Sequence, residues 1–232
     1  DYHIPVKGRD KHGLDARLVA GLPAERKPGL IITVDCGISN HSDSAELRQQ
    51  GVEVIVTDHH EVVMPLPPAL AVVDPKRSDS EYPYGQLTGA GVALKLMMGL
   101  VAHRLGLSVT QFVSAQPELL ELVTLGTVAD RAPLTGENRI LVKLGFDRLM
   151  KTRLPALRAV LDNLREGNEP LTVSTFLTEL LPLFAAANGS EGVRKFLSRD
   201  LAEVQAWVKE LTVRSQEWRQ EAERTFQLAQ AH

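Results

Sequence analysis

The chain has 232 residues, of which 44% are hydrophobic, and this is enough to bury a sizeable core. Its formal net charge of −3 gives no overall basic character that would by itself indicate a nucleic-acid partner. Because the sequence has a single cysteine, no apolar run near the roughly 20 residues of a membrane helix and no signal-peptide pattern at its start, we expect a soluble cytoplasmic protein without disulfides or a membrane partner.

Three short apolar runs in the first third of the chain each end at an aspartate. They are residues 30–34, 52–57 and 70–73, followed by Asp35, Asp58 and Asp74. Runs this short and this rich in Ile and Val are typical of buried strands in a parallel sheet. Residues 42–50 have helical composition, with Ser42 or Asp43 as the expected N-cap and Gly51 as the stop. The pattern predicts a strand–helix–strand unit, with the aspartates at the edge where such sheets bind ligands.

The remainder of the chain is predicted to be helical. Prolines mark a loop around the third strand, and helix resumes at about Gly89. Helices are expected over residues 94–105, 119–129 and 140–150, and a small helical region over 154–197. Residues 201–231 carry apolar side chains three, four or seven positions apart on an otherwise polar helix. The expected fold is therefore α/β, a parallel sheet flanked by helices, with a helical C-terminal extension and a long connector helix.

The densest group of chemically active side chains is Asp58-His59-His60, directly after the second predicted strand. Asp35 stands at the equivalent end of the first strand. Carboxylate and imidazole together suit Mn²⁺, Mg²⁺ or Zn²⁺. Taken singly, Asp35 could cap a helix and Asp130 could end one, but as a set these residues favour a metal site.

Four motifs in order make the sequence resemble the DHH phosphoesterases. They are Val34-Asp35-Cys36-Gly37, Thr57-Asp58-His59-His60, Gly89-Ala90-Gly91-Val92-Ala93, and Leu125-Gly126-Thr127-Val128-Ala129-Asp130 followed by Gly136-Glu137-Asn138-Arg139. The last pair resembles the single-stranded-DNA exonucleases of that family. The resemblance implies a partial catalytic domain over 1–153, a small helical region over 154–198 and an interdomain connector helix over 199–232.

The resemblance also implies roles for the residues of the first two motifs and for Asp130. Asp35 would bridge two divalent cations, Mn²⁺ or Mg²⁺, and His59 and Asp130 would be ligands of one of them. His60 would contact the scissile phosphate or its surroundings, and Asp58 would orient its neighbours. Two cations held in this way activate a water and neutralise charge on the phosphoryl oxygens.

A second set of residues is expected to bind substrate. Gly89, Ala90 and Gly91 could present backbone N–H groups to a phosphate at a helix N-terminus, although close helix–sheet packing needs small residues equally. Asn138 and Arg139 belong to the motif shared with the exonucleases. Seven basic residues between positions 139 and 165 could meet a phosphate backbone or form a solvated helical face.

The sequence also departs from the family it resembles. Members carry an earlier Asp-x-Asp motif that supplies ligands to both metals, and a later DHH-associated domain, and neither is found in these residues. The exonucleases usually have Arg, Asn and a Gly-Arg pair after a proline where this chain has Leu183, Ala185, Asn188 and Gly189. We therefore expect a part of a longer protein, holding at best one incomplete metal site and inactive as a nuclease by itself.

The function expected from the resemblance is metal-dependent degradation of single-stranded DNA in repair and recombination. A related activity on oligonucleotides, cyclic dinucleotides or pyrophosphate is the alternative within the family. A non-catalytic nucleic-acid-binding scaffold is the alternative outside catalysis, favoured by the altered segment after Pro182 and opposed by the intact Asp35, His59, His60 and Asp130.

Overall fold

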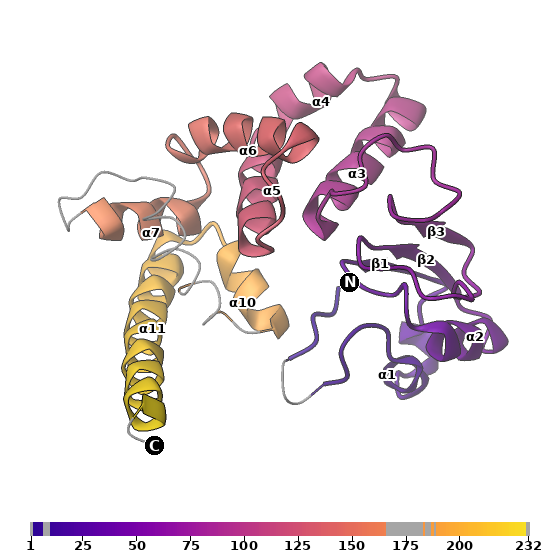
Figure 1. Ribbon diagram of the computed structural model, residues 1–232, viewed down its shortest axis with the longest axis horizontal. Helices are drawn as coiled ribbons and strands as arrows, with labels where there is room; N and C mark the ends of the chain where they lie inside the picture. Colours follow the sequence, from indigo (N-terminus) through magenta and orange to yellow (C-terminus); the bar gives the residue numbers. More distant parts are fainter. Residues whose placement is uncertain (1, 7–9, 166–182, 184–186, 188, 231–232) are drawn as a thin grey trace. The chain divides into compact units, whose positions relative to one another are not determined.

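The computed structural model describes residues 2–6, 10–165, 183, 187 and 189–230. The chain divides into two compact units (Figure 1). One unit is Gly8–Arg148, and the other is Leu149–His232 together with Asp1–Lys7. The three domains expected from the sequence stay a prediction.

The first unit contains a three-stranded parallel sheet in the order β1-β2-β3. Its strands are β1 (Leu30–Val34), β2 (Glu53–Thr57) and β3 (Ala71–Val73). The register aligns Ile32 with Ile55, and Ile55 with Ala71, so the three carboxyl ends lie at one edge. The predicted α/β fold with a parallel sheet is confirmed.

The crossover helix between the first two strands, α2 (His41–Gln49), begins one residue earlier than predicted. Its N-cap is Asn40, which makes no side-chain capping bond, so the expected cap at Ser42 or Asp43 is wrong. Asp43 lies inside the first turn and is buried, and its carboxylate binds Lys11 Nζ at 2.6 and 2.7 Å. The Asp43 side chain, which the sequence predicted as a local cap, instead forms an ion pair with a residue distant in the sequence. Gly51 follows the helix with φ +76°, as its expected role as the stop requires.

One face of the sheet is covered by α2 and by the short helix α1 (Ala16–Ala20), as Figure 1 shows. The core between them includes Leu14, Leu47, Val54 and Val56. Neither α1 nor the single turn η1 (Ala24–Arg26) was predicted, because helices this short carry too little periodic pattern.

The helices on the other side of the sheet pack closely through small residues. They are α3 (Gly89–Leu105), the unpredicted α4 (Val109–Ala115), α5 (Glu118–Ala129) and α6 (Gly136–Leu149). Helix α3 begins at Gly89, where helix was expected to resume, and α5 and α6 begin before their expected first residues. A Cβ on Gly126 would lie 2.7 Å from Ala90 Cβ, and one on Gly145 would lie 2.2 Å from the Leu120 carbonyl oxygen. Glycine at both positions therefore lets α3, α5 and α6 approach one another.

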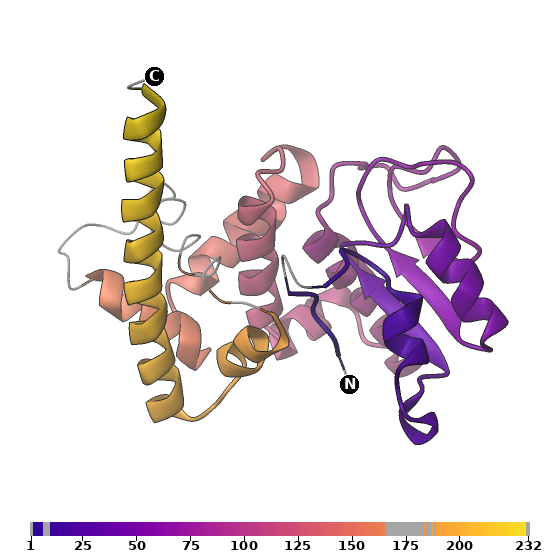
Figure 2. The same ribbon diagram turned by 90° about the horizontal axis from the view of Figure 1, so that it is seen from below.

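The second unit is helical, built from α7 (Pro155–Arg165), α10 (Gly189–Phe196) and α11 (Leu201–Gln230). The long terminal helix predicted for 201–231 is confirmed, and Figure 2 shows it as one continuous element. Its first half is buried at Val204, Val208 and Leu211, whereas Trp218 and Phe226 are more than half exposed. The distal half of α11 thus presents apolar side chains at the surface.

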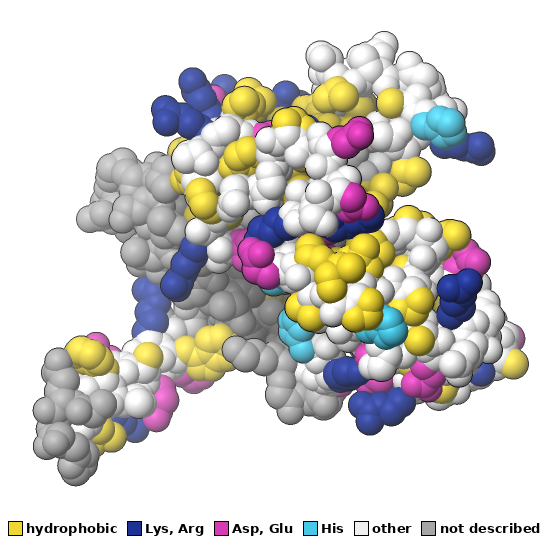
Figure 3. All heavy atoms as spheres, turned by 45° about the vertical axis from the view of Figure 1, so that its right-hand side comes forward, with side chains coloured by type: hydrophobic (Ala, Val, Ile, Leu, Met, Phe, Trp, Pro, Cys, Tyr) yellow, Lys and Arg dark blue, Asp and Glu magenta, His cyan; other side chains and the backbone are white. Residues whose placement is uncertain are grey.

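Other large apolar side chains are also exposed. Leu30, Ile32 and Val34 on β1 are each about half exposed, and Figure 3 shows hydrophobic side chains gathered among charged ones on one face of the molecule. Within the described residues, no single helix is long and apolar enough to cross a membrane. Helices α3 and α4, bent by 108° where they meet, pass that length and composition test only as a pair.

Candidate metal centre

The first two strands end at the residues expected to bind metal. The Asp35 N–H donates to the Thr57 carbonyl oxygen at 3.0 Å, so the chain leaving β1 stays attached to the end of β2. Asp35 itself has φ +63°, in the left-handed region that non-glycine residues seldom adopt. Such conformations persist only where surrounding contacts impose them, and they concentrate at functional sites.

His59 lies between two carboxylates contributed by different elements. Its Nε2 is 2.9 Å from Asp35 Oδ1 and 3.7 Å from Asp130 Oδ2. Asp130 is also the C-cap of α5, so the simpler role of ending a helix and the position beside His59 coexist. The imidazole is buried, but the two carboxylates are about half exposed and open to further ligands.

The Asp35 carboxylate has the largest effect on the pKa of His59. Its hydrogen bond raises the pKa of His59, with the charges of Asp35 and Asp130 acting in the same direction against the opposing effect of burial. A metal ion binds the neutral imidazole, so a cation and a proton compete for Nε2.

Asp58 is the structural centre of the Asp58-His59-His60 motif. It is 1% exposed, and its Oδ1 accepts from the His59 N–H at 2.8 Å and contacts His60 Nδ1 at 2.6 Å, while its Oδ2 accepts from the Ile38 N–H at 2.9 Å. Burial acts to raise the pKa of Asp58, but the hydrogen bonds from Ile38, His60 and His59 outweigh it and lower the pKa. An ionised Asp58 therefore fixes the His60 ring and leaves Nε2 for another contact.

Four of these residues are close enough to share one cation. Ligand atoms of Asp35, Asp58, His59 and His60 all lie within 4.8 Å of one another. Because Asp58 already makes three close contacts, Asp35 and His59 are the better-placed donors, with Asp130 beside them.

The segment Gly89-Ala90-Gly91 opens α3 directly against this cluster. A Cβ on Gly89 would lie 2.2 Å from Asp35 Oδ1, so only glycine lets the carboxylate lie against the first turn of the helix. Thr88 caps the helix by accepting from the Gly91 N–H at 3.2 Å. Close packing thus accounts for the small residues at 89 and 90, and phosphate binding by this segment stays a prediction.

In the exonuclease-like motif, the side chain of Asn138 connects two loops of the fold. Asn138 is fully buried, and its amide nitrogen donates to the carbonyl oxygens of Gln86 at 2.7 Å and Pro133 at 3.2 Å. It holds together the two loops that precede α3 and α6. Arg139 is exposed on α6, and a substrate-binding role for either residue stays a prediction.

Asp74 is a residue of this edge that sequence reasoning left without a role. It follows β3 as Asp35 and Asp58 follow their strands, and it is 4% exposed. Its Oδ1 accepts from the Lys76 N–H at 2.8 Å, and burial raises its pKa. Its position at a strand end was the available signal.

Of the four positions at which the sequence departs from the exonucleases, two can be placed. Leu183 is buried and Gly189 begins α10. Ala185 and Asn188 lie outside the described residues.

Comparison with known proteins identifies the family. The model of the DHH family, N-terminal domain, matches residues 1–127. The chain belongs to the DHH family. The single-stranded-DNA-specific exonuclease RecJ of Dickeya dadantii is 36% identical over 241 residues, which cover 100% of this chain and 41% of that protein. RecJ of Thermus thermophilus is 39% identical over 187 residues, which cover 78% of this chain and 26% of that protein.

Solved structures agree with the sequence relatives. The crystal structure of exonuclease RecJ bound to manganese has a TM-score of 0.76 and 35% identity, covering 96% of this chain and 55% of that one. The resemblance to the single-stranded-DNA exonucleases of the DHH family is thereby confirmed. The chain spans about two fifths of the length of the Dickeya relative.

Proposed function

We propose that this chain is the metal-binding part of an exonuclease that hydrolyses single-stranded DNA with Mn²⁺ or Mg²⁺, in DNA repair and recombination. The observation that carries the proposal is the position of His59, whose Nε2 lies against the carboxylates of Asp35 and Asp130. The relatives bearing the exonuclease name and the manganese-bound RecJ structure support the same reaction.

The donor set fits a divalent cation. Two half-exposed carboxylates and a buried imidazole combine the oxygen ligands of Mg²⁺ and Mn²⁺ with a nitrogen ligand that Mn²⁺ also accepts. Asp35, with one oxygen toward His59 and the rest of its carboxylate exposed, is the residue suited to bridge to a second cation. When bound, the cations lower the pKa of a water and neutralise the phosphoryl oxygens.

The chain's own groups do the positioning. Asp58 holds the His60 ring through Nδ1, so Nε2 of His60 is left to contact the substrate phosphate. His60 therefore acts on the substrate with its ring positioned by Asp58, and Asp35, His59 and Asp130 act on the metal.

The substrate-binding residues complete the proposal. Arg139 and Lys143 are exposed on α6 and would contact the phosphate backbone, together with N–H groups of Gly89 and Ala90 at the start of α3. The single cysteine supports a cytoplasmic location, where DNA is processed.

The proposal is tested first by metal binding to this chain. Calorimetric titration with Mn²⁺ should give one site that Asp35→Ala removes and that Asp147→Ala, an exposed carboxylate on α6, leaves unchanged. Equal Mn²⁺ binding by both variants would contradict the site.

The second test is hydrolysis by the full-length gene product, because this chain covers two fifths of the Dickeya relative. We expect Mn²⁺-dependent shortening of single-stranded DNA that Asp35→Ala abolishes. Hydrolysis of cyclic dinucleotides or pyrophosphate in its place would assign the alternative activity within the family, and binding of DNA without hydrolysis would assign a scaffold.

A further inference from the structure

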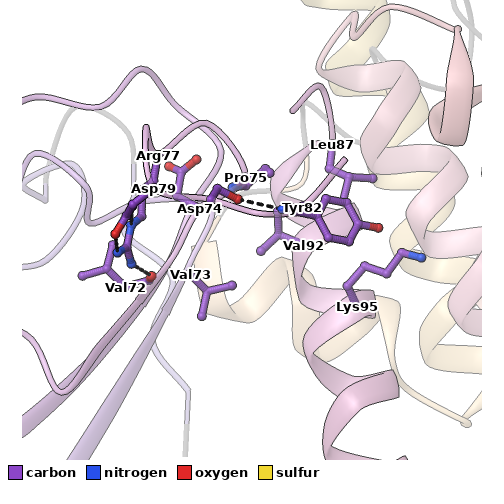
Figure 4. A pocket seen from close by; sticks show the side chains of 11 residues that line it. Val72, Val73, Asp74, Pro75, Arg77, Asp79, Tyr82, Leu87, Val92 and Lys95 are labelled. Atoms are coloured by element: carbon purple, nitrogen blue, oxygen red, sulfur yellow. Dashed lines mark hydrogen bonds and ion pairs between the residues drawn. The ribbon is translucent and has the colours of Figure 1, made fainter. Parts of the chain in front are cut away.

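A cavity of about 310 Å³ lies between the end of β3, the loop that follows it and the first turns of α3 (Figure 4). Its walls are mainly apolar, with Val72 and Val73 from the strand and Leu87 and Val92 from the loop and helix. Its volume is at the lower end of the ~300–1,000 Å³ typical of small-ligand sites. None of the residues assigned above to metal or phosphate lines it.

One end of the cavity combines an aromatic ring with a cation, as Figure 4 shows for Tyr82 and Lys95. The Lys95 ammonium is 6.0 Å from the centre of the Tyr82 ring, and Lys95 is also ion-paired with Glu137. The Tyr82 hydroxyl donates to Glu137 Oε2 at 2.5 Å. Glu137 therefore holds ring and cation in fixed positions, so binding a ligand there needs little ordering of side chains.

The cavity adjoins the metal cluster through the sheet. The Asp58 N–H donates to the Val73 carbonyl oxygen at 3.0 Å, so a wall of the cavity is bonded to the residue that precedes His59. Neighbouring strands lie about 4.8 Å apart. The base of a nucleotide whose phosphate is bound at the cluster could thus enter the cavity.

The lining carries no excess negative charge that would repel a nucleotide. Arg77 pairs with Asp79 within the lining, and the two carboxylates of the lining, Asp74 and Asp79, are matched in number by its two cations, Arg77 and Lys95. The apolar walls offer few groups that could read the edge of a base. Recognition would therefore occur through the face of the base, which every base possesses.

We propose that this cavity receives one nucleobase of a single-stranded nucleic acid whose phosphate lies at the Asp35–His59 cluster, with the base stacked on Tyr82. The inference rests on the proposed function and adds to it a site for the base. An apolar side chain of a protein partner is the competing occupant. It would fit the walls, but it gives no role to the cation fixed beside the ring or to the adjoining phosphate site.

The first experiment measures binding of a short oligothymidylate and of an abasic strand of the same length to this chain in Mn²⁺, by fluorescence anisotropy. Stacking of one base predicts about tenfold tighter binding of the thymidylate (~1.4 kcal/mol). Tyr82→Ala should reduce this preference to less than about twofold, and Tyr82→Phe should retain it, because the ring remains.

Tyr84→Ala is the matched control. Tyr84 is on the same loop and its hydroxyl likewise bonds toward α6, donating to the Thr135 carbonyl oxygen at 2.8 Å, but it does not line the cavity. The variant should keep the full preference for the base-bearing strand. An unchanged preference in Tyr82→Ala, or an equal loss in both alanine variants, would overturn the proposal.

A second measurement does not depend on any substitution. Addition of thymidine monophosphate should shift the methyl NMR signals of Val72, Leu87 and Val92, whereas deoxyribose 5-phosphate should leave them in place. No shift with the nucleotide would exclude the base site and leave a protein side chain as the occupant. If the full-length product fails to hydrolyse DNA while the nucleotide still shifts these methyls, the proposed function fails and the base site stands.

Discussion

Substitution of Gly89 by alanine tests whether the start of α3 holds the Asp35 carboxylate in place. The new Cβ would lie 2.2 Å from Asp35 Oδ1 and 2.5 Å from its Cγ. Restoring an ordinary contact of about 3.5 Å moves the carboxylate by about 1 Å. Since metal–ligand distances tolerate only about 0.2 Å, we expect Mn²⁺ affinity to fall at least tenfold.

The matched control is Gly99→Ala in the same helix. Gly99 is exposed, and a Cβ there would meet nothing within 4 Å. Alanine should therefore stabilise α3 by about 0.5–1 kcal/mol, the usual difference from glycine in a helix. Mn²⁺ affinity should not change.

The two variants are compared by thermal unfolding with and without Mn²⁺. At 100 times its Kd, Mn²⁺ stabilises the parent chain by about 2.7 kcal/mol, and a tenfold weaker site gives about 1.4 kcal/mol. The metal-induced rise in Tm should thus be smaller by about 3–5 °C in Gly89→Ala. A parental rise in that variant would refute the reasoning that packing at residue 89 positions Asp35.

Three further predictions concern the pH dependence and stability of the chain. Because the pKa of His59 is raised, Mn²⁺ affinity measured by titration should be constant above that pKa and fall about tenfold per pH unit below it, and a flat profile would show that His59 is not a ligand. The pKa of Asp43 is lowered because the hydrogen bonds from Lys11, the Ala16 N–H and Asn40 outweigh the effect of burial. The ionised Asp43 therefore stabilises the fold above the ordinary Asp pKa, and this stabilisation is lost as pH falls through the lowered value. Acid unfolding of Asp43→Asn should accordingly depend less on pH than that of the parent chain. Leu211→Ala should destabilise the second unit by about 2–5 kcal/mol in urea, whereas Trp218→Ala should change its stability by less than about 0.5 kcal/mol; similar losses would show that the distal half of α11 is packed in this chain.

The sheet and its order along the chain could be read from the sequence. Strand β1 coincides with its predicted bounds, and the other two differ from theirs by one residue at the start. Short Ile- and Val-rich runs have few other structures open to them, and parallel strands joined by a helix end at a common edge. The same logic was enough to suggest Asp35 and Asp58 as neighbours.

Helix starts depended on contacts that the sequence does not show. Asp43 was expected as a cap, but Lys11, 32 residues away, binds it in a partly buried ion pair. Gly89 was compatible with phosphate binding or packing, and the approach of Asp35 accounts for it by packing. In each case a contact with a residue distant in the sequence explains the residue better than the local role that the sequence suggested.

The sequence by itself determined the family, the sheet and the residue types of the metal site, because these follow from local pattern and motif order. Only the tertiary structure decided which groups meet. Asp130 at the end of α5 lies beside His59, and the Asp58 carboxylate is hydrogen-bonded by Ile38 and His60. Glu137 holds Tyr82 beside a cavity. Distances between side chains on separate elements depend on how helices pack on the sheet. That packing is set by the whole core and by the glycines that permit close approach.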